Sequence, residues 1–330
     1  MNTKRPLICT GINDNYAWPW MVSIFSAKMY SEIPFDVALG AIRGRISPQT
    51  RSMLERFCER IDINLIFKEF EFYDKVQVDS RITAESYLRL LWLDYLDSDF
   101  MWLDSDTLPL ANWDKIFDVV SKANSETSII FAAIDHYTLS WSHLQQDNDA
   151  VRIAGKSYFN AGIVIVRPSL WKTKKYDSVW RKVGSKYIEH GFKFWDQDIL
   201  NYILNEEKTL ISSQYNFIVP TDPKNISARI LHFAGSPKPW HLSKNARSYF
   251  LACESLEKKE REKSSFLAPG WEMPYENYYR HENALLHEFQ DTPALYKELQ
   301  TCADNSRSPI MSKKDEIKFM ALTRAGRKWL

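Results

Sequence analysis

The chain has 330 residues, of which 43 are basic, 42 acidic and 14% aromatic. This near-balance of charge excludes a basic field spread over the whole surface, so we expect no nucleic-acid partner. The length holds one large domain or two smaller ones. The first residues, MNTKRPLICTG, contain too short an apolar run for a signal peptide, and 18 apolar residues never occur together. The four cysteines lack zinc or redox spacing, so we expect a soluble protein of the cytoplasm.

Strands and helices alternate along the first 245 residues. Apolar runs predict strands at 6–11, 35–42, 63–72, 100–103, 128–135, 157–167 and 228–235. Amphipathic patterns and start signals such as Ser47-Pro48 predict helices at 17–31, 47–60, 82–96 and 196–206. This alternation predicts an α/β domain with a largely parallel sheet over residues 1–245.

Residues 246–330 have a different composition. They begin with a charged run, SLEKKEREKSS, continue through the aromatic segment WEMPYENYYRHE, and end with IKFMALTRAGRKWL. The last segment combines apolar residues at roughly helical spacing with four basic ones. Two interpretations stay open for it, namely peripheral contact with the inner, anionic face of a membrane and packing back on the domain.

Paired aspartates provide the first functional signal. Four Asp-x-Asp pairs occur, at 97/99, 104/106, 147/149 and 196/198. Only Asp104 and Asp106 directly follow an apolar strand, and α/β folds bind ligands at the carboxyl ends of strands. In an extended chain the two side chains project to the same side about 7 Å apart, so they need a cation between them.

Two chemistries use such a pair. In a phosphatase of the haloacid-dehalogenase type, Asp104 is the nucleophile and Asp106 a general acid/base, but the later acidic motif for magnesium is missing. In a nucleotide-sugar glycosyltransferase, both carboxylates hold Mn²⁺ against a diphosphate. A non-catalytic nucleotide-sugar binding protein is a third interpretation.

The segment LHFAGSPKPWH favours the transferase. Its imidazole, His232, suits Mn²⁺ better than Mg²⁺. Gly235 allows the backbone to approach a ligand closely, and Lys238 supplies a compact positive charge between two prolines. These groups make a plausible cradle for a diphosphate, and the phosphatase interpretation has no use for them.

With these residues in view, the chain resembles the retaining family 8 glycosyltransferases, the family of glycogenin and the bacterial lipopolysaccharide galactosyltransferases. The similar motifs occur in family order: TGINDNYAWP, YLRL, LDSDTLPLANWDKIF, YFNAG, DQDILN and HFAGSPKPW. The resemblance implies a GT-A type, Rossmann-like nucleotide-sugar-binding domain with a mixed, mostly parallel sheet, followed by a C-terminal helical extension. It also implies transfer of glucose or galactose from a UDP-sugar to a glycan or lipid-linked acceptor, with Mn²⁺ as cofactor and Mg²⁺ as the alternative ion.

The resemblance also implies roles for single residues. Asp104, Asp106 and His232 are the implied metal ligands. The implied donor-binding set also includes Thr10, Asn13, Tyr16, Arg81, Arg89, Ser105, Asn160, Asp196, Gln197, Gly235 and Lys238. Tyr16 would stack on the uracil, while Asn13 stands where some members have an aspartate that contacts the base.

The implied catalytic set is Asp196, Gln197, Arg89 and Lys238, and Asp135 would touch the acceptor. Asp196 opens a helix, where an acid also complements the helix dipole, so binding and capping are compatible. Gln197 would lie beneath the anomeric carbon, where retaining glycosidases place a carboxylate. Because an amide is a poor nucleophile, the resemblance implies attack on the same face as the departing diphosphate.

Overall fold

The computed structural model describes residues 5–71, 84–123, 126–135, 158–187, 194–219, 228–235, 238–242 and 272–307. Arg81, the pair Asp147/Asp149 and the basic segment 317–330 lie outside the described residues. No helix within the described ranges is long and apolar enough to cross a membrane.

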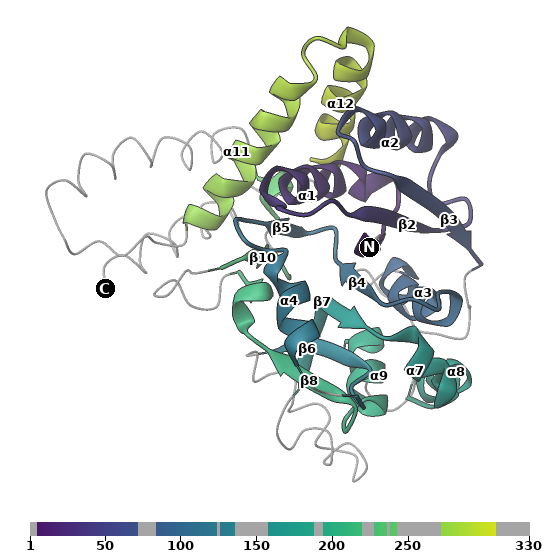
Figure 1. The fold of residues 1–330 in the computed structure, drawn as a ribbon. Coiled ribbons are helices and arrows are strands. Elements are labelled where there is room, and N and C mark those ends of the chain that lie inside the picture. The colour runs from purple at the N-terminus through teal and green to yellow at the C-terminus, as the bar shows by residue number, and fades with distance from the viewer. Residues whose placement is uncertain are drawn as a thin grey trace, which may run out of the picture.

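A seven-stranded mixed sheet forms the centre of the fold (Figure 1). Its strands, in spatial order, are β3 (Leu65–Phe70), β2 (Asp36–Ile42), β1 (Leu7–Gly11), β4 (Phe100–Leu103), β7 (Phe159–Val166), β6 (Ile130–Ile134) and β8 (Lys208–Ile211). The first four are parallel, β7 is antiparallel to both of its neighbours, and β8 is parallel to β6. The predicted mixed, mostly parallel sheet is therefore confirmed.

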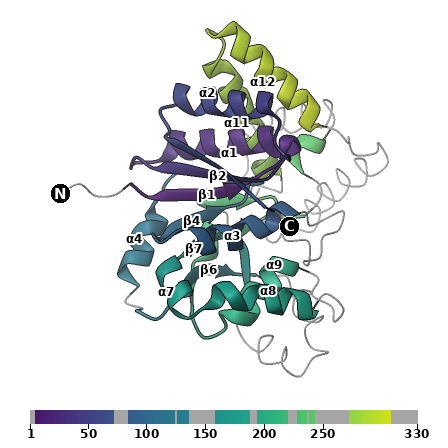
Figure 2. The same ribbon diagram turned by 90° about the vertical axis from the view of Figure 1, so that its right-hand side faces the viewer.

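Both faces of the sheet are covered, which explains why its central strands are apolar without alternation. Ile8 faces one hydrophobic cluster and its neighbour Cys9 faces the other. The same alternation places Met101 in the first cluster and Trp102 in the second. Figure 2 shows helices on either side of this central layer.

The helices differ in part from those predicted. They are α1 (Ala17–Tyr30), α2 (Pro48–Arg60), α3 (Leu88–Tyr95), α4 (Lys115–Lys122), α7 (Pro168–Thr173), α8 (Tyr176–Tyr187), α9 (Trp195–Ile203), α11 (Glu272–Glu288) and α12 (Pro293–Ser306). Ser47 caps α2 by accepting a hydrogen bond from the Thr50 amide, as its Ser-Pro start predicts. Of the helix predicted at 82–96, residues 84–87 form a 3₁₀ turn and α3 follows directly. The sequence analysis did not identify α4, α7 or α8.

A small second sheet corrects one prediction. It consists of β5 (Thr107–Pro109), β10 (Ile230–His232) and β9 (Phe217–Ile218), in the order β5-β10-β9. The segment 228–235 was expected as a further strand of the α/β sheet, but it pairs antiparallel with β5 and parallel with β9 instead. In that pairing His232 lies opposite Thr107, so the small sheet brings His232 to the end of β4.

The predicted C-terminal helical extension is confirmed as α11 and α12, which pack on α1 (Figure 1). The Trp18 indole donates to Glu282 Oε1 at 2.8 Å, and Tyr278 belongs to the same hydrophobic cluster as α1. Tyr279 donates to the carbonyl oxygen of Pro239 at 2.9 Å. The helix α11 therefore supports both the start of α1 and the segment that carries Lys238. The boundary near residue 245 stays a prediction.

Candidate functional site

The two aspartates lie in a turn, not in an extended strand as expected. The chain leaves the main sheet after Leu103 and enters the small sheet at Thr107, so it must bend between them. The Asp104 amide donates to Gly162 O at 2.8 Å, and the Thr107 hydroxyl donates to Asp104 O at 2.7 Å. The Phe233 amide fixes the other end by donating to Asp106 O at 2.9 Å. Both carboxylates still face one site.

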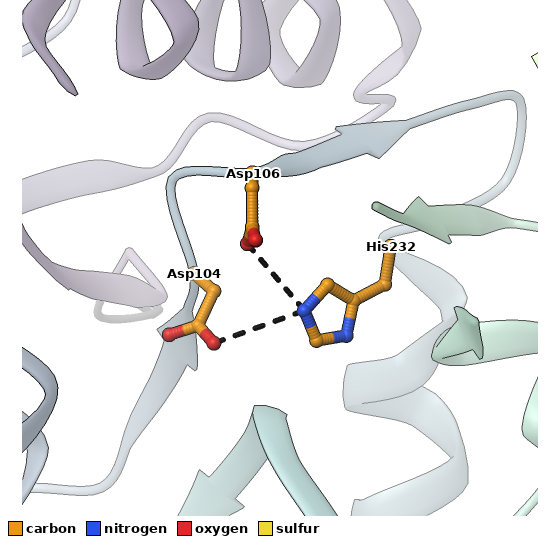
Figure 3. A group of neighbouring side chains, drawn as sticks. All are labelled: Asp104, Asp106 and His232. Carbon is orange, nitrogen blue, oxygen red and sulfur yellow. Dashed lines mark ion pairs between the residues drawn. The ribbon is translucent and has the colours of Figure 1, made fainter. Parts of the chain in front are cut away.

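Asp104, Asp106 and His232 converge at this turn (Figure 3). His232 Nε2 lies 3.4 Å from Asp106 Oδ1 and 3.9 Å from Asp104 Oδ2. One nitrogen and two oxygens, one atom from each residue, all lie within 4.8 Å of one another. The three predicted metal ligands are thus brought together.

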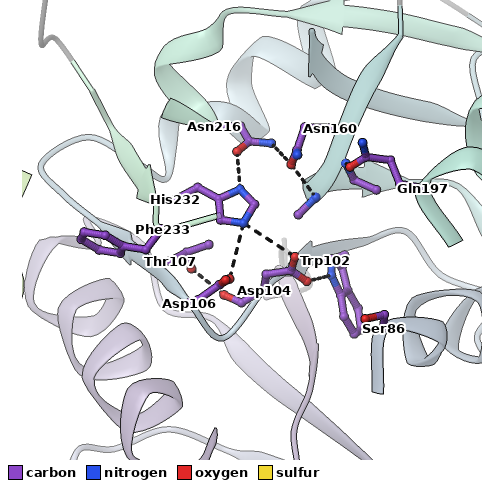
Figure 4. A network of polar contacts seen from close by, with 12 residues as sticks. Ser86, Trp102, Asp104, Asp106, Thr107, Asn160, Gln197, Asn216, His232 and Phe233 are labelled. Carbon is purple, nitrogen blue, oxygen red and sulfur yellow. Dashed lines mark hydrogen bonds and ion pairs between the residues drawn. The ribbon is translucent and has the colours of Figure 1, made fainter. Parts of the chain in front are cut away.

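Each carboxylate is held through its other oxygen by a donor of the protein. Asp104 Oδ1 accepts from Arg89 Nη2 at 2.9 Å and from Trp102 Nε1 at 2.6 Å. Asp106 Oδ2 accepts from Lys238 Nζ, which also donates to Phe233 O at 2.6 Å. One oxygen of each carboxylate therefore remains directed at His232 Nε2 (Figure 4).

The neighbouring charges set the ionisation of this cluster. Burial raises the pKa of Asp104 despite the opposing charge of Arg89. Burial also acts to raise the pKa of Asp106, but the positive charge of Lys238 outweighs it and holds that pKa below its usual value. Arg89 and Lys238 keep raised pKa values because nearby carboxylates outweigh their burial. The site thus contains two fixed cations beside the two acids.

Arg89 and Lys238 offset part of the negative charge of the two aspartates. A divalent cation between the aspartates would offset the rest. Two carboxylate oxygens and one imidazole nitrogen are a donor set that suits a divalent metal ion. Both second oxygens are occupied by protein donors, as expected when the ligand atoms are oriented in advance. The described residues therefore fit a divalent metal ion at Asp104, Asp106 and His232.

A buried polar network lies next to Asp104, Asp106 and His232 (Figure 4). Gln197 Nε2 donates to Asp135 Oδ2 at 3.1 Å and to the Tyr158 hydroxyl at 3.1 Å. Gln197 Oε1 accepts from the Ala161 amide at 3.0 Å, and Asn160 Nδ2 donates to Asp135 Oδ2 at 3.3 Å. Residues predicted to bind the sugar donor and a residue predicted to bind the acceptor substrate thus belong to one hydrogen-bond network.

The start of α9 brings Asp196 to the same region. Its Oδ2 lies 3.0 Å from Arg89 Nε, so Arg89 bridges Asp196 and Asp104. Burial raises the pKa of Asp196 to about 7, although Arg89 opposes this shift. Asp198 stabilises the start of α9, because its Oδ2 accepts from the Phe194 amide at 2.9 Å. Trp195 takes a φ of 43°, a strained value for a bulky residue.

The predicted nucleotide side lies at the end of β1. Thr10 is buried, and its hydroxyl has no hydrogen-bond partner among the residues that the structure describes. Asn13 Oδ1 accepts from the Asn15 amide at 3.1 Å, so it caps the following turn. Tyr16 stands edge-on to Trp240, with ring centroids 5.8 Å apart. Burial and the nearby Asp106 raise the pKa of its hydroxyl, against the effect of Lys238.

The remaining predicted residues also have defined places. Gly235 is exposed and takes a φ of 91°, the left-handed region in which glycine is favoured. Ser105 lies between the two aspartates in the turn. The role of each residue in ligand binding stays a prediction.

Sequence reasoning assigned no role to Gly162 or Asn216. A Cβ atom on Gly162 would lie 2.2 Å from His232 Cε1 and 2.9 Å from Asp104 Oδ2, so only glycine fits beneath these two ligands. The motif YFNAG could have indicated Gly162. Asn216 Oδ1 lies 2.9 Å from His232 Nδ1, and no pattern around residue 216 indicates that contact.

Comparison with known proteins connects this geometry to a family. A family model described as Glycosyl transferase family 8 matches residues 7–244. The chain is 24% identical over 245 residues to a candidate glycosyltransferase of Haemophilus influenzae, an alignment that covers 69% of this chain and 71% of that protein. It is 26% identical over 255 residues to human glycogenin-2, covering 70% of this chain and 44% of glycogenin-2. The chain therefore spans less than half of glycogenin-2.

The fold is similar to that of the galactosyltransferase LgtC, whose crystal structure contains donor and acceptor sugar analogues. The TM-score is 0.59 at 18% identity, and the match covers 84% of this chain and 95% of LgtC. The family match sets aside the phosphatase interpretation of Asp104. With a GT-A-like fold and a family model matched over most of its length, the chain belongs to Glycosyl transferase family 8 and is a glycosyltransferase.

Proposed function

We propose that the chain is a Mn²⁺-dependent retaining transferase that moves glucose or galactose from a UDP-sugar to a glycan or lipid-linked acceptor. The observation that carries the proposal is the convergence of Asp104, Asp106 and His232, with Lys238 on one side and Arg89 on the other. When bound, the metal ion would neutralise charge on the diphosphate leaving group.

Lys238 and Arg89 have different parts in this proposal. Lys238 donates hydrogen bonds to Asp106 and to Phe233 O beside the candidate metal site. There it would stabilise negative charge that develops on the leaving diphosphate. Arg89 is shared between Asp104 and Asp196. It would therefore hold a metal-binding carboxylate and a sugar-binding carboxylate in fixed relation to each other.

The network around Gln197 supports a reaction without a covalent sugar intermediate. Its carbonyl oxygen accepts from a backbone amide, and its NH₂ group donates to two partners, so the amide is held in one orientation and its weakly nucleophilic oxygen is already engaged. An active-site variant of LgtC replaces a glutamine by glutamate, so the active site of that enzyme also contains a glutamine. A leaving phosphate oxygen would then take the proton of the acceptor, which Asp135 would help to bind.

A screen of nucleotide sugars for donor hydrolysis tests the proposal without knowledge of the acceptor. We expect UDP release from UDP-glucose or UDP-galactose with Mn²⁺ and none in EDTA. With an acceptor in hand, the product should keep the anomeric configuration of the donor, as read by NMR. Undiminished hydrolysis in EDTA would refute the metal assignment, and a lack of UDP release from either sugar would refute the proposed donor.

We predict that Lys238→Ala lowers turnover by about 10²-fold, the size of effect seen when one preorganised donor is removed from a charge-stabilising site. Donor KM should change less, because the interaction strengthens as the leaving group gains charge. Steady-state kinetics with saturating Mn²⁺ would measure both constants. Lys115→Ala is a suitable control, because Lys115 pairs with Glu32 on the exposed surface. An unchanged kcat for Lys238→Ala would remove this residue from the leaving-group site.

A further inference from the structure

His232 is useful as a metal ligand only in one of its two neutral tautomers. Its Nε2 faces Asp104 and Asp106, and its Nδ1 lies 2.9 Å from Asn216 Oδ1. If the ring hydrogen is on Nδ1, then Nε2 presents a lone pair to the metal position. If the hydrogen is on Nε2, that lone pair is lost. The question is what selects between the two forms.

A backbone amide settles the orientation of the neighbouring side chains, because it can only donate. The Gly162 amide lies 2.9 Å from one side-chain atom of Asn160, so that atom must be the oxygen, Oδ1. The same oxygen is 2.8 Å from one terminal atom of Asn216, which must therefore be its NH₂ group. Asn216 consequently turns its own oxygen toward His232, and Nδ1 must carry the hydrogen.

A second backbone amide fixes the far end of the network. The Ala161 amide contacts Gln197 Oε1 at 3.0 Å, so the NH₂ group of Gln197 is the one that contacts Asp135 Oδ2. Asn160 Nδ2 reaches the same carboxylate oxygen. Asn160, Gln197, Asn216 and His232 are all at least nine-tenths buried, so bulk water offers these groups no easy alternative partner.

We propose that Asn216 is a positioning residue of the metal site: it accepts the hydrogen of His232 Nδ1 and so reserves Nε2 for the metal. The small sheet makes this contact possible, because β9 begins directly after Asn216 and pairs with β10, which ends at His232. Through Asn160 and Asp135, the same hydrogen bonds join the metal ligand to Gln197. The inference deepens the proposed function, since it rests on a metal ion binding at His232.

The first experiment reads the tautomer of neutral His232 in the metal-free protein, at a pH at which the ring carries a single hydrogen. Long-range ¹H–¹⁵N NMR correlations of the seven histidine rings distinguish the two forms, and a His232→Gln variant identifies the His232 signals. We expect the Nδ1–H form in the wild type and in Asn216→Asp, whose carboxylate still accepts from Nδ1. In Asn216→Leu no acceptor remains, and we expect the Nε2–H form or a mixture.

The second experiment measures the Kd for Mn²⁺ by electron paramagnetic resonance. Asn216→Leu should weaken binding about 10–100-fold, as loss of such a supporting hydrogen bond typically does. Asn216→Asp should restore part of the affinity, because its carboxylate accepts from Nδ1 but cannot donate to Asn160 Oδ1. Asn201→Leu is the matched control. Asn201 is also fully buried and bonds both backbone groups of Phe159, so its loss should lower stability without changing the tautomer or the Kd.

An Nε2–H tautomer in the wild type would overturn the inference. An Asn216→Leu protein that keeps both the tautomer and the Kd would also overturn it. If the wild type shows the expected tautomer but binds no Mn²⁺, the proposed function fails while the orienting role of Asn216 stands, so the two failures can be told apart.

Discussion

Gly162→Ala should lose Mn²⁺ binding and sugar transfer together, with a loss of about 1–3 kcal/mol in folding stability from overpacking. The new Cβ atom would lie 2.2 Å from His232 Cε1 and 2.8 Å from His232 Nδ1, closer than packed atoms can approach. It would also lie 2.9 Å from Asp104 Oδ2. Because the ring is buried and held by Asn216, relief of the clash must move one or both of these candidate metal ligands.

Gly40→Ala separates this effect from general overpacking. Gly40 lies in β2 of the same sheet, and its added Cβ would lie 2.7 Å from Trp92 Nε1, with no candidate metal ligand among its nearest atoms. Thermal unfolding should therefore show a comparable loss of stability, whereas the Mn²⁺ Kd should stay near that of the wild type. If Gly162→Ala binds Mn²⁺ as tightly as Gly40→Ala does, the metal site does not depend on the absence of a side chain at position 162.

The sequence was most informative where a signal is local. Continuous apolar runs predicted β1, β2 and β4, because strands buried on both faces contain little else. Ser47 and Pro48 predicted the start of α2 for an equally local reason. The candidate metal ligands were identified from short motifs, since Asp104 and Asp106 follow a strand directly and His232 ends another.

Features that depend on pairing between distant segments could not be predicted in this way. The strand β5 is three residues long and contains proline, so it has no periodic pattern of its own. The placement of β10 beside β5 follows from contacts across more than 120 positions in the chain. Asn216 meets His232 only through that small sheet. Buried polar contacts of this kind become visible only when the partners are assembled.

Arg89→Met should destabilise the protein by about 3–5 kcal/mol, the usual cost of removing one partner of a buried ion pair. Arg89 is 6% exposed and bridges Asp104 and Asp196. Methionine would fill much of the same space but leave both acids without their shared cation. We expect transfer activity to fall as well, because Asp104 and Asp196 would no longer be held in fixed positions relative to each other.

The pH dependence identifies the cause of this loss. In the wild type, burial raises the pKa of Asp196 to about 7 in spite of Arg89, so without Arg89 the folded-state pKa should rise further. A higher folded-state pKa makes the folded protein bind more protons, so its stability declines as pH rises. The deficit of Arg89→Met relative to the wild type should therefore be smaller at about pH 6 than at about pH 8.

Denaturant unfolding in EDTA at the two pH values would measure this deficit. Arg56→Met is the control, since Arg56 pairs with Glu298 on the exposed surface and such pairs contribute at most about 1 kcal/mol. Saturating Mn²⁺ should recover part of the loss in Arg89→Met, because the ion would supply charge beside Asp104 but not beside Asp196. A deficit that is independent of pH would mean that Arg89 stabilises the fold by packing, and that the two acids do not require its charge.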